Sequence, residues 1–391
     1  MIISIVANIS LLAVFKYYDF FVSNINQVTG TNFILLNYIL PIGLSFHTFQ
    51  SMSYTIEVYR GKQKAIHHPG YYALYVMFYP QLVAGPIERP QKLIPQLFVE
   101  QKFSSRKLYE GLRLMAWGFF KKLVIADRIG KYADVIFSDP THAGTVPAWV
   151  AVFFFSIQIY ADFSGYSDIA IGAARCMGID LSMNFNRPYQ SINIKEFWRR
   201  WHISLSTWFR DYVYIPLGGN RKSIVRNHVN ILVTFVLSAL WHGAGWTFIV
   251  WGTLHGMYTL IYKWLNNSVG LFVPKVLAWM LTGLCVGFAW IFFRASSIDN
   301  AIQVIIQGIM FEDFSLNNFT IAVAGVEFGN FTLLFSFCMI GYMFLIERYT
   351  EPKMFDLNSK KITDIIIFVT TILLITFFGV FQKSSFIYFQ F

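Results

Sequence analysis

A histidine lies in the middle of a long uncharged segment. The stretch "SALWHGAGWTFIVWG" (238–252) contains His242, and no Lys, Arg, Asp or Glu occurs from Asn227 to Tyr262. An ionisable side chain in such a segment is costly to keep in lipid, so it is a functional hypothesis by default. A neutral imidazole can accept a proton from a hydroxyl group, which makes His242 a candidate general base. The glycines of "HGAG" allow a sharp turn, so we expect His242 to lie at a buried turn between two helices. The alternative role is a chemically silent histidine that is hydrogen-bonded at this bend.

A second histidine, His202, lies in the aromatic and basic segment "KEFWRRWHISLSTWFRDYVYIPLGGNRKS" (195–223). Apolar residues recur here every four positions and predict the stripe of one helix: Phe197, Trp201, Leu205 and Phe209. The segment is either an amphipathic helix in the membrane interface or a platform whose arginines hold the phosphates of an anionic donor. The candidate donor-binding residues are Arg199, Arg200, Trp201 and Arg210.

Two aspartates in "IYADFSGYSDIAIG" (159–172) also need explaining. Asp162 and Asp168 flank a glycine after an apolar run, and we expect the helix to break between them. They either cap helix ends at an interface or, together with Trp241, line a polar cavity. The residues leave both alternatives open.

The elements that must position these residues are apolar helices. The chain has 391 residues, of which 55% are hydrophobic and 13% are charged, whereas a soluble domain has about a quarter charged. Uncharged runs cover 1–15, 65–87, 140–161, 227–262, 276–293, 328–346 and 365–382. A helix needs roughly 20 apolar residues to cross a bilayer, and several runs are long enough. The sequence therefore predicts an all-α polytopic membrane protein with a single domain over 1–391.

The charge pattern orients the chain and excludes nucleic acid as a partner. The net charge is +10, but the basic residues lie between apolar runs, as they do in cytoplasmic loops. The segment 187–226 carries eight basic residues against two acidic ones, so we expect it to be cytoplasmic. Counting spans from there places an aromatic tail, 383–391, outside the cytoplasm. The proline-rich stretch 79–97 predicts a re-entrant element or an interfacial loop.

The motifs of soluble enzymes are missing from the sequence. It contains no phosphate-binding loop, dinucleotide fingerprint, HExxH or GxSxG motif, and its three cysteines have no metal-like spacing, so we expect no metal site. One alternative class is a transporter in which His242, Asp162 and Asp168 form a polar pathway. The arginine- and tryptophan-rich segment, and the lack of two matching halves, favour an enzyme.

Four stretches together resemble the membrane-bound O-acyltransferase family, in particular its bacterial alginate O-acetyltransferase branch. They are "YPQLVAGPIERPQKLIPQL", "FWRRWHISLSTWFRDYVYIPLGG", "ALWHGAGWTFIVWG" and the terminal "FIYFQF". The resemblance implies a helical bundle with re-entrant or interfacial helices around a central tunnel, in the bacterial inner membrane. It also implies that His242 is the catalytic histidine and that His202 lines the same tunnel. Acetyl-CoA would be the acyl-donor substrate, with no tightly bound cofactor.

The resemblance also implies partners outside the cytoplasm. They are a periplasmic or cell-surface protein of the O-acetyltransferase or esterase type and a polysaccharide acceptor, for which alginate-like exopolysaccharide is the first choice. Peptidoglycan, another surface glycan and D-alanyl transfer to teichoic acid are the alternatives. Tyr388 in the aromatic tail is a candidate acyl acceptor, and its alternative role is an aromatic interface anchor. Members of this branch carry further N-terminal spans, which we expect to be missing here.

Overall fold

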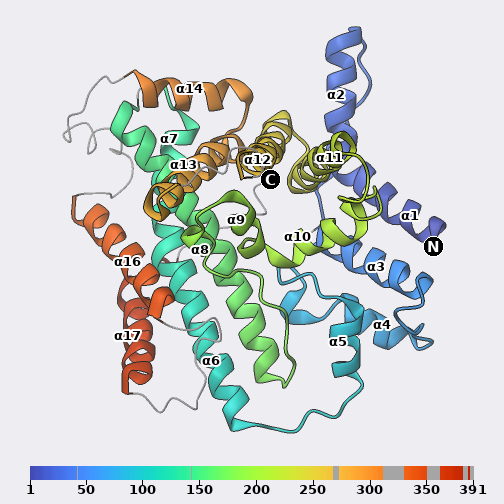
Figure 1. Ribbon diagram of the computed structural model, residues 1–391. Helices are drawn as coiled ribbons and strands as arrows, with labels where there is room; N and C mark the ends of the chain where they lie inside the picture. The colour runs from blue at the N-terminus through green and yellow to red at the C-terminus, as the bar shows by residue number, and fades with distance from the viewer. Residues whose placement is uncertain are drawn as a thin grey trace.

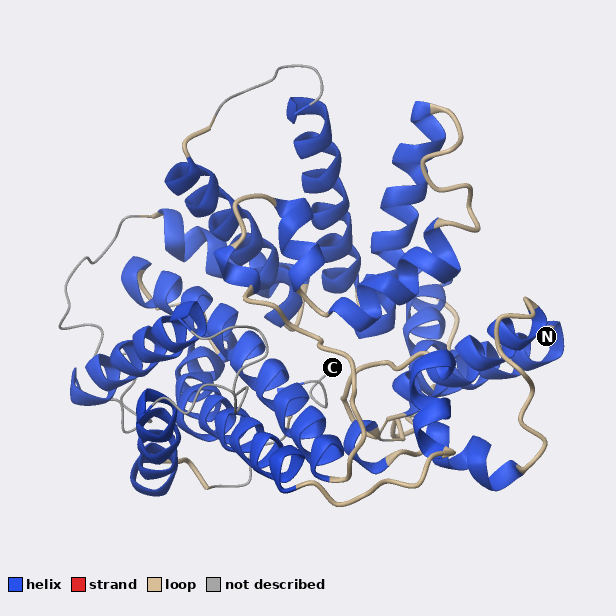
Figure 2. Cartoon of the chain, turned by 60° about the horizontal axis from the view of Figure 1, so that its bottom comes forward, coloured by secondary structure: helices blue, strands red, loops and turns tan. Residues whose placement is uncertain are grey.

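The computed structural model of the protein describes residues 1–41, 43–141, 143–266, 273–310, 330–349, 362–381 and 386–387. Over these residues the chain forms helices and loops and no strands (Figure 2). Five helical stretches are long and apolar enough to cross a membrane: Ile2–Thr29, Thr145–Cys176, Ile224–His242, Lys275–Arg294 and Phe331–Arg348. The predicted all-α polytopic membrane protein is thus confirmed.

The elements follow one another along the chain as a series of long helices separated by short ones (Figure 1). They are α1 (Ile2–Leu12), η1 (Ala13–Tyr17), α2 (Tyr18–Thr29), α3 (Leu44–Tyr59), α4 (Pro69–Val76), η2 (Tyr79–Gln81), α5 (Pro90–Leu97), α6 (Ser105–Phe119), η3 (Phe120–Ala126), α7 (Asp127–Ser138), α8 (Thr145–Cys176), η4 (Pro188–Gln190), α9 (Ile194–Arg200), α10 (Ile203–Phe209), η5 (Arg210–Tyr214), α11 (Ile224–His242), α12 (Trp246–Trp264), α13 (Lys275–Arg294), α14 (Ile298–Ile309), α16 (Asn330–Tyr349) and α17 (Ile362–Phe378).

The long helix α8 is the centre of the bundle, and α6 runs beside it (Figure 1). Two pairs of glycines lie where these helices meet, Gly111 with Gly172 and Gly118 with Gly165. A Cβ atom on Gly118 would lie 2.5 Å from the carbonyl oxygen of Gly165, so a side chain there would force the helices apart. Small residues at such contacts let two membrane helices approach backbone to backbone.

The predicted helix break between Asp162 and Asp168 is wrong. Helix α8 continues through Gly165 without interruption, and both aspartates lie inside it. The glycine serves the contact with α6 instead of a turn, and glycine is common in membrane helices for this reason. The two carboxylates therefore project from a continuous helix and do not cap helix ends.

The segment 195–223 also differs from the single helix that its apolar stripe predicts. It forms two short helices, α9 and α10, which meet at Trp201 and His202, and the π-helix η5 follows. His202 has φ +42°, a left-handed conformation that no α-helix can continue through. The four residues of the predicted stripe are nevertheless all buried in the main core: Phe197, Trp201, Leu205 and Phe209.

The uncharged run 227–262 forms a helical hairpin. Helix α11 ends at His242, three residues turn, and α12 starts at Trp246. A Cβ atom on Gly243 would collide with the ring of Phe248, so the turn requires glycine at this position. The prediction that His242 lies at a glycine turn between two helices is confirmed.

The proline-rich stretch 79–97 forms short elements only. It contains the 3-10 turn η2 and the helix α5, which starts at Pro90. Proline is well suited to a first helical position because its missing N–H has no partner to lose there. The apolar run 65–87 likewise holds only α4 and η2, so it does not form a single span.

Candidate active site

The two candidate histidines come together in the centre of the molecule. The ring centroids of His202 and His242 are 6.4 Å apart, and the residues are only 1% and 5% exposed. His242 is the last residue of α11, and His202 lies between α9 and α10. A turn in one segment and a left-handed residue in the other thus bring two imidazoles together, and we call the buried rings around His202 and His242 the histidine chamber.

The hydrogen bonds around His202 determine which ring nitrogen carries its proton. The side-chain oxygen Oδ1 of Asn184 accepts from the backbone N–H and the hydroxyl of Ser204, so it is an acceptor. His202 Nδ1 lies 3.1 Å from the same oxygen and must therefore donate. Its Nε2 is left with a lone pair, and among the described residues no group hydrogen-bonds to it. Burial lowers the pKa of His202 to about 3, so the imidazole is neutral.

A lysine that the sequence analysis missed holds the backbone of His242. The ammonium group of Lys16 donates to the carbonyl oxygens of Trp241 at 2.6 Å and His242 at 2.8 Å. The last carbonyls of a helix have no partner within the helix, and a cation there also interacts favourably with the helix dipole. The sequence feature that could have pointed to Lys16 is its position as the first charged residue after the apolar run 1–15.

A row of aromatic rings connects the two histidines with the region of α9. The ring of His242 lies 5.3 Å from Trp251, and His255 lies 5.0 Å from both Trp251 and Trp198. His255 is completely buried. Among the described residues, no hydrogen-bond partner is found for either ring nitrogen of His255 or for the indole nitrogens of Trp198 and Trp251. Buried polar atoms normally have partners, so these nitrogens mark a place where a polar molecule can bind.

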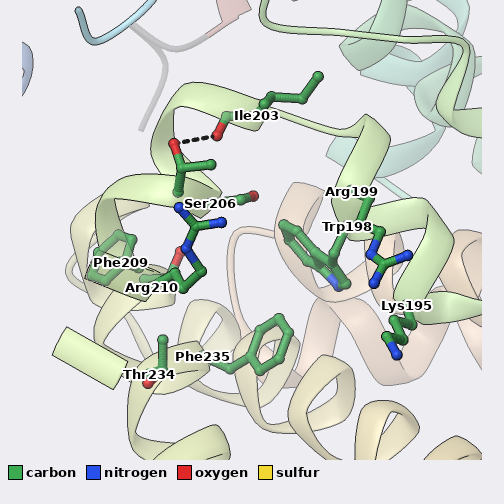
Figure 3. A pocket seen from close by; sticks show the side chains of 11 residues that line it. Lys195, Trp198, Arg199, Ile203, Ser206, Phe209, Arg210, Thr234 and Phe235 are labelled. Carbon is green, nitrogen blue, oxygen red and sulfur yellow. Dashed lines mark hydrogen bonds between the residues drawn. The ribbon is translucent and has the colours of Figure 1, made fainter. Parts of the chain in front are cut away.

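Trp198 also lines a pocket of about 480 Å³ between α9, α10 and α11 (Figure 3). Lys195 and Arg199 lie on one side of it and Arg210 lies on the other, with Trp198 and Phe235 between them (Figure 3). Its remaining lining residues are Ile203, Ser206, Thr207, Phe209, Thr234 and Ser238. Three exposed cations over an aromatic floor suit an anionic ligand with a ring.

The four candidate donor-binding residues occupy different places. Arg199 and Arg210 line the pocket, and Arg210 also pairs with Asp211 at 2.8 Å. Arg200 pairs with Glu196 at 2.7 Å, and Trp201 is buried in the core. Neither of the latter two is a lining residue of the pocket. Lys195, which the sequence analysis did not single out, lines the pocket and has no carboxylate partner among the described residues.

The three candidate tunnel-lining residues, Trp241, Asp162 and Asp168, also occupy different places. Trp241 packs beside both catalytic candidates, with its ring 6.1 Å from His202 and 5.0 Å from His242. Asp162 and Asp168 instead form ion pairs with Lys122 at 2.9 Å and Lys121 at 2.5 Å. Tyr388 lies outside the described residues, and of the tail 383–391 the structure describes only 386–387. Across the described part of the chain, no group of three or more His, Cys, Asp or Glu residues could hold a metal ion.

Comparison with known proteins identifies the family of the chain. Residues 8–299 match MBOAT, the membrane-bound O-acyltransferase family. The chain belongs to this family. Both histidines, the row of rings and the cationic pocket lie within the matched residues.

Relatives of this family member act on different polymers, as their names state. A peptidoglycan O-acetyltransferase of Helicobacter pylori is 39% identical over 78% of this chain. A probable alginate O-acetylase, AlgI, of Pseudomonas aeruginosa is 39% identical over 90% of the chain, and a teichoic acid D-alanyltransferase of Bacillus subtilis is 31% identical over 58%. The matches cover 63%, 68% and 61% of the relatives' own lengths, so the chain spans about two thirds of them.

Proposed function

We propose that the protein is an O-acetyltransferase that takes an acetyl group from acetyl-CoA at the cytoplasmic side and transfers it toward an extracytoplasmic polysaccharide. The observation that carries the proposal is a cationic pocket at Trp198, from which ring contacts lead through His255 and Trp251 to His242. We take this row of rings as the proposed path of the donor, with an anion-binding entrance and a reactive end. The bacterial inner membrane is the location that this direction of transfer requires.

The pocket suits the nucleotide part of acetyl-CoA. Arginines bind phosphates with paired N–H donors, and Arg199 and Lys195 have no carboxylate partner among the described residues. Trp198 and Phe235 offer flat faces for an adenine ring. The amide-containing arm of the donor would then follow Trp198, Trp251 and His255, whose nitrogens can hydrogen-bond to it.

At the end of the path, His242 would act as the general base. An acceptor hydroxyl attacks the carbonyl carbon of the thioester, and its proton passes to the imidazole of His242. The carbon–sulfur bond then breaks, and the protonated imidazole returns the proton to the departing thiolate. His202 carries a lone pair on Nε2 and lies beside His242, where it would stabilise the imidazolium that forms during the transfer.

The immediate acceptor that we propose is the phenol of Tyr388, from which a periplasmic or cell-surface partner protein would take the acetyl group. Tyr388 directly follows Ile387, and the structure places Ile387 in the buried core. For the final acceptor, the names of the relatives support alginate-like exopolysaccharide and peptidoglycan equally, at 39% identity each. D-alanyl transfer to teichoic acid is the second candidate, supported by the relatives of that name.

The test uses the full-length protein in lipid nanodiscs with radiolabelled acetyl-CoA. We expect His242→Gln to lower the rate of thioester consumption about 10²- to 10⁴-fold, the usual contribution of a general base. We also expect Tyr388→Phe, which keeps the aromatic ring, to abolish labelling of the protein. Donor turnover that survives His242→Gln at the wild-type rate would overturn the proposed role of this histidine.

A further inference from the structure

A buried carboxylate on α8 holds the backbone of the C-terminal segment. The backbone N–H of Ile387 donates to Asp162 Oδ2 at 2.8 Å. Asp162 is 2% exposed and Ile387 is 1% exposed, so water cannot replace this bond. The two residues are 225 positions apart in the chain. The contact therefore holds Ile387 against α8.

The charge of Asp162 is neutralised by a lysine from the neighbouring helix. Lys122 Nζ lies 2.9 Å from Asp162 Oδ1 and 2.8 Å from Asp127 Oδ1. An unpaired carboxylate in a buried position would be costly, and it would take up a proton. With Lys122 beside it, one oxygen of Asp162 meets the ammonium and the other is free to accept the N–H of Ile387.

The π-helix η3 lets two neighbouring lysines each form an ion pair with α8. Lys121 and Lys122 are neighbours in η3, and they pair with Asp168 and Asp162 respectively. Side chains of adjacent residues in an α-helix do not face the same partner. The wider turn of η3 directs both ammonium groups toward α8, and π-helices of this kind are frequent at functional sites.

The ring that precedes the anchored residue contacts the wall of the histidine chamber. Phe386 packs against Phe163 and Tyr166 with ring centroids 5.9 and 5.2 Å away. Phe163 in turn lies edge-on to His202, with centroids 4.6 Å apart. One aromatic ring therefore separates the anchored end of the chain from a candidate catalytic histidine.

We infer that Asp162, paired with Lys122, is the docking site for the C-terminal segment and a positioning residue for acyl transfer to that segment. The inference rests on the proposed function, because a fixed Ile387 matters to catalysis only if Tyr388, the next residue, accepts the acetyl group. The anchor itself does not depend on that chemistry. It makes the peptide N–H of Ile387 the recognised group.

The anchor is tested by hydrogen–deuterium exchange of the full-length protein in nanodiscs, followed on the C-terminal peptide that contains Ile387. We expect Asp162→Ala to speed exchange of this peptide at least tenfold, since the acceptor is lost. Asp162→Asn keeps an oxygen acceptor and should have a smaller effect. Asp168→Asn is the matched control, because it breaks a buried lysine pair on the same helix without touching Ile387.

Folding of these variants is controlled in the same experiment. Lys122 still has Asp127 as a partner when Asp162 is replaced, so no ammonium is left unpaired. Peptides from α6 and α8 should therefore keep their protection in all three variants. Wild-type exchange of the C-terminal peptide in Asp162→Ala would overturn the anchor, and so would equal deprotection of that peptide in Asp168→Asn.

The positioning role is tested by kinetics with acetyl-CoA. We expect Asp162→Ala to lower kcat about tenfold with KM for acetyl-CoA unchanged, and Asp162→Asn to restore part of the rate. A released C-terminal peptide with wild-type kcat would overturn the positioning role while the anchor stands. A wild-type protein that consumes no acetyl-CoA would instead overturn the proposed function, and the exchange experiment would still decide on the anchor.

Discussion

The histidine chamber and the cationic pocket are the two regions that the proposed donor path would join, and they differ in charge and exposure. In the chamber, His202 and His242 are at most 5% exposed, and the rings around them are aromatic. In the pocket, Lys195, Arg199 and Arg210 are exposed and positively charged. Charges in the pocket act through water and salt, whereas lone pairs in the chamber act without competition from water.

Because of this difference, we expect the pocket to affect donor binding and the histidine chamber to affect the chemical step. A cation at the pocket stabilises a bound anion equally in the ground state and in the transition state, so its loss should raise KM and leave kcat unchanged. A lone pair that acts only on the reacting hydroxyl should affect kcat. The comparison therefore predicts two kinds of variant that differ in which kinetic constant changes.

After His242, the largest effect is expected at His202. Replacing it with alanine removes the Nε2 lone pair and one of the hydrogen-bond donors to Asn184 Oδ1. We expect kcat to fall about 100-fold, the lower range for a group that assists proton transfer. The matched control is Ser204→Ala, which removes another hydrogen bond to Asn184 Oδ1 but leaves this oxygen as the acceptor for Nδ1–H, so it should retain most of the rate. Steady-state kinetics with acetyl-CoA measures both. A His202→Ala protein that loses only donor affinity would remove the distinction between chamber and pocket.

An intermediate effect is expected at the pocket. Arg199→Ala should raise KM for acetyl-CoA about fivefold with kcat unchanged, because an exposed ionic contact contributes about 1 kcal/mol. The same loss should shrink as salt rises, since counterions screen exposed charges. Arg200→Ala is the control from the same helix, because Arg200 pairs with Glu196 and does not line the pocket. Equal KM values for the two variants would argue against donor binding in this pocket.

The sequence predicts those parts of the site that depend on a local pattern of residues. A glycine turn within an apolar run predicts where His242 lies, and the helical hairpin confirms it. The break at His202 could not be predicted, because it is stabilised by Asn184, which lies 18 residues away. The continuity of α8 through Gly165 was equally hidden, since the glycine faces another glycine on α6. Lys16 and Ile387 act through contacts more than 220 residues away, and no local pattern reports such contacts.

The smallest effect is expected at His255, and it tests whether the row of rings belongs to the path. His255→Phe keeps the ring and removes both unpartnered nitrogens. Replacing a buried polar group that has no partner with an apolar ring of similar shape should leave the stability equal or slightly higher, which a thermal melt would measure. If the donor's amide groups bind these nitrogens, KM for acetyl-CoA should nevertheless rise about threefold, the cost of roughly one net hydrogen bond. A variant that is more stable and has an unchanged KM would show that the donor does not pass His255, and the path would then have to reach His242 along Trp241 instead.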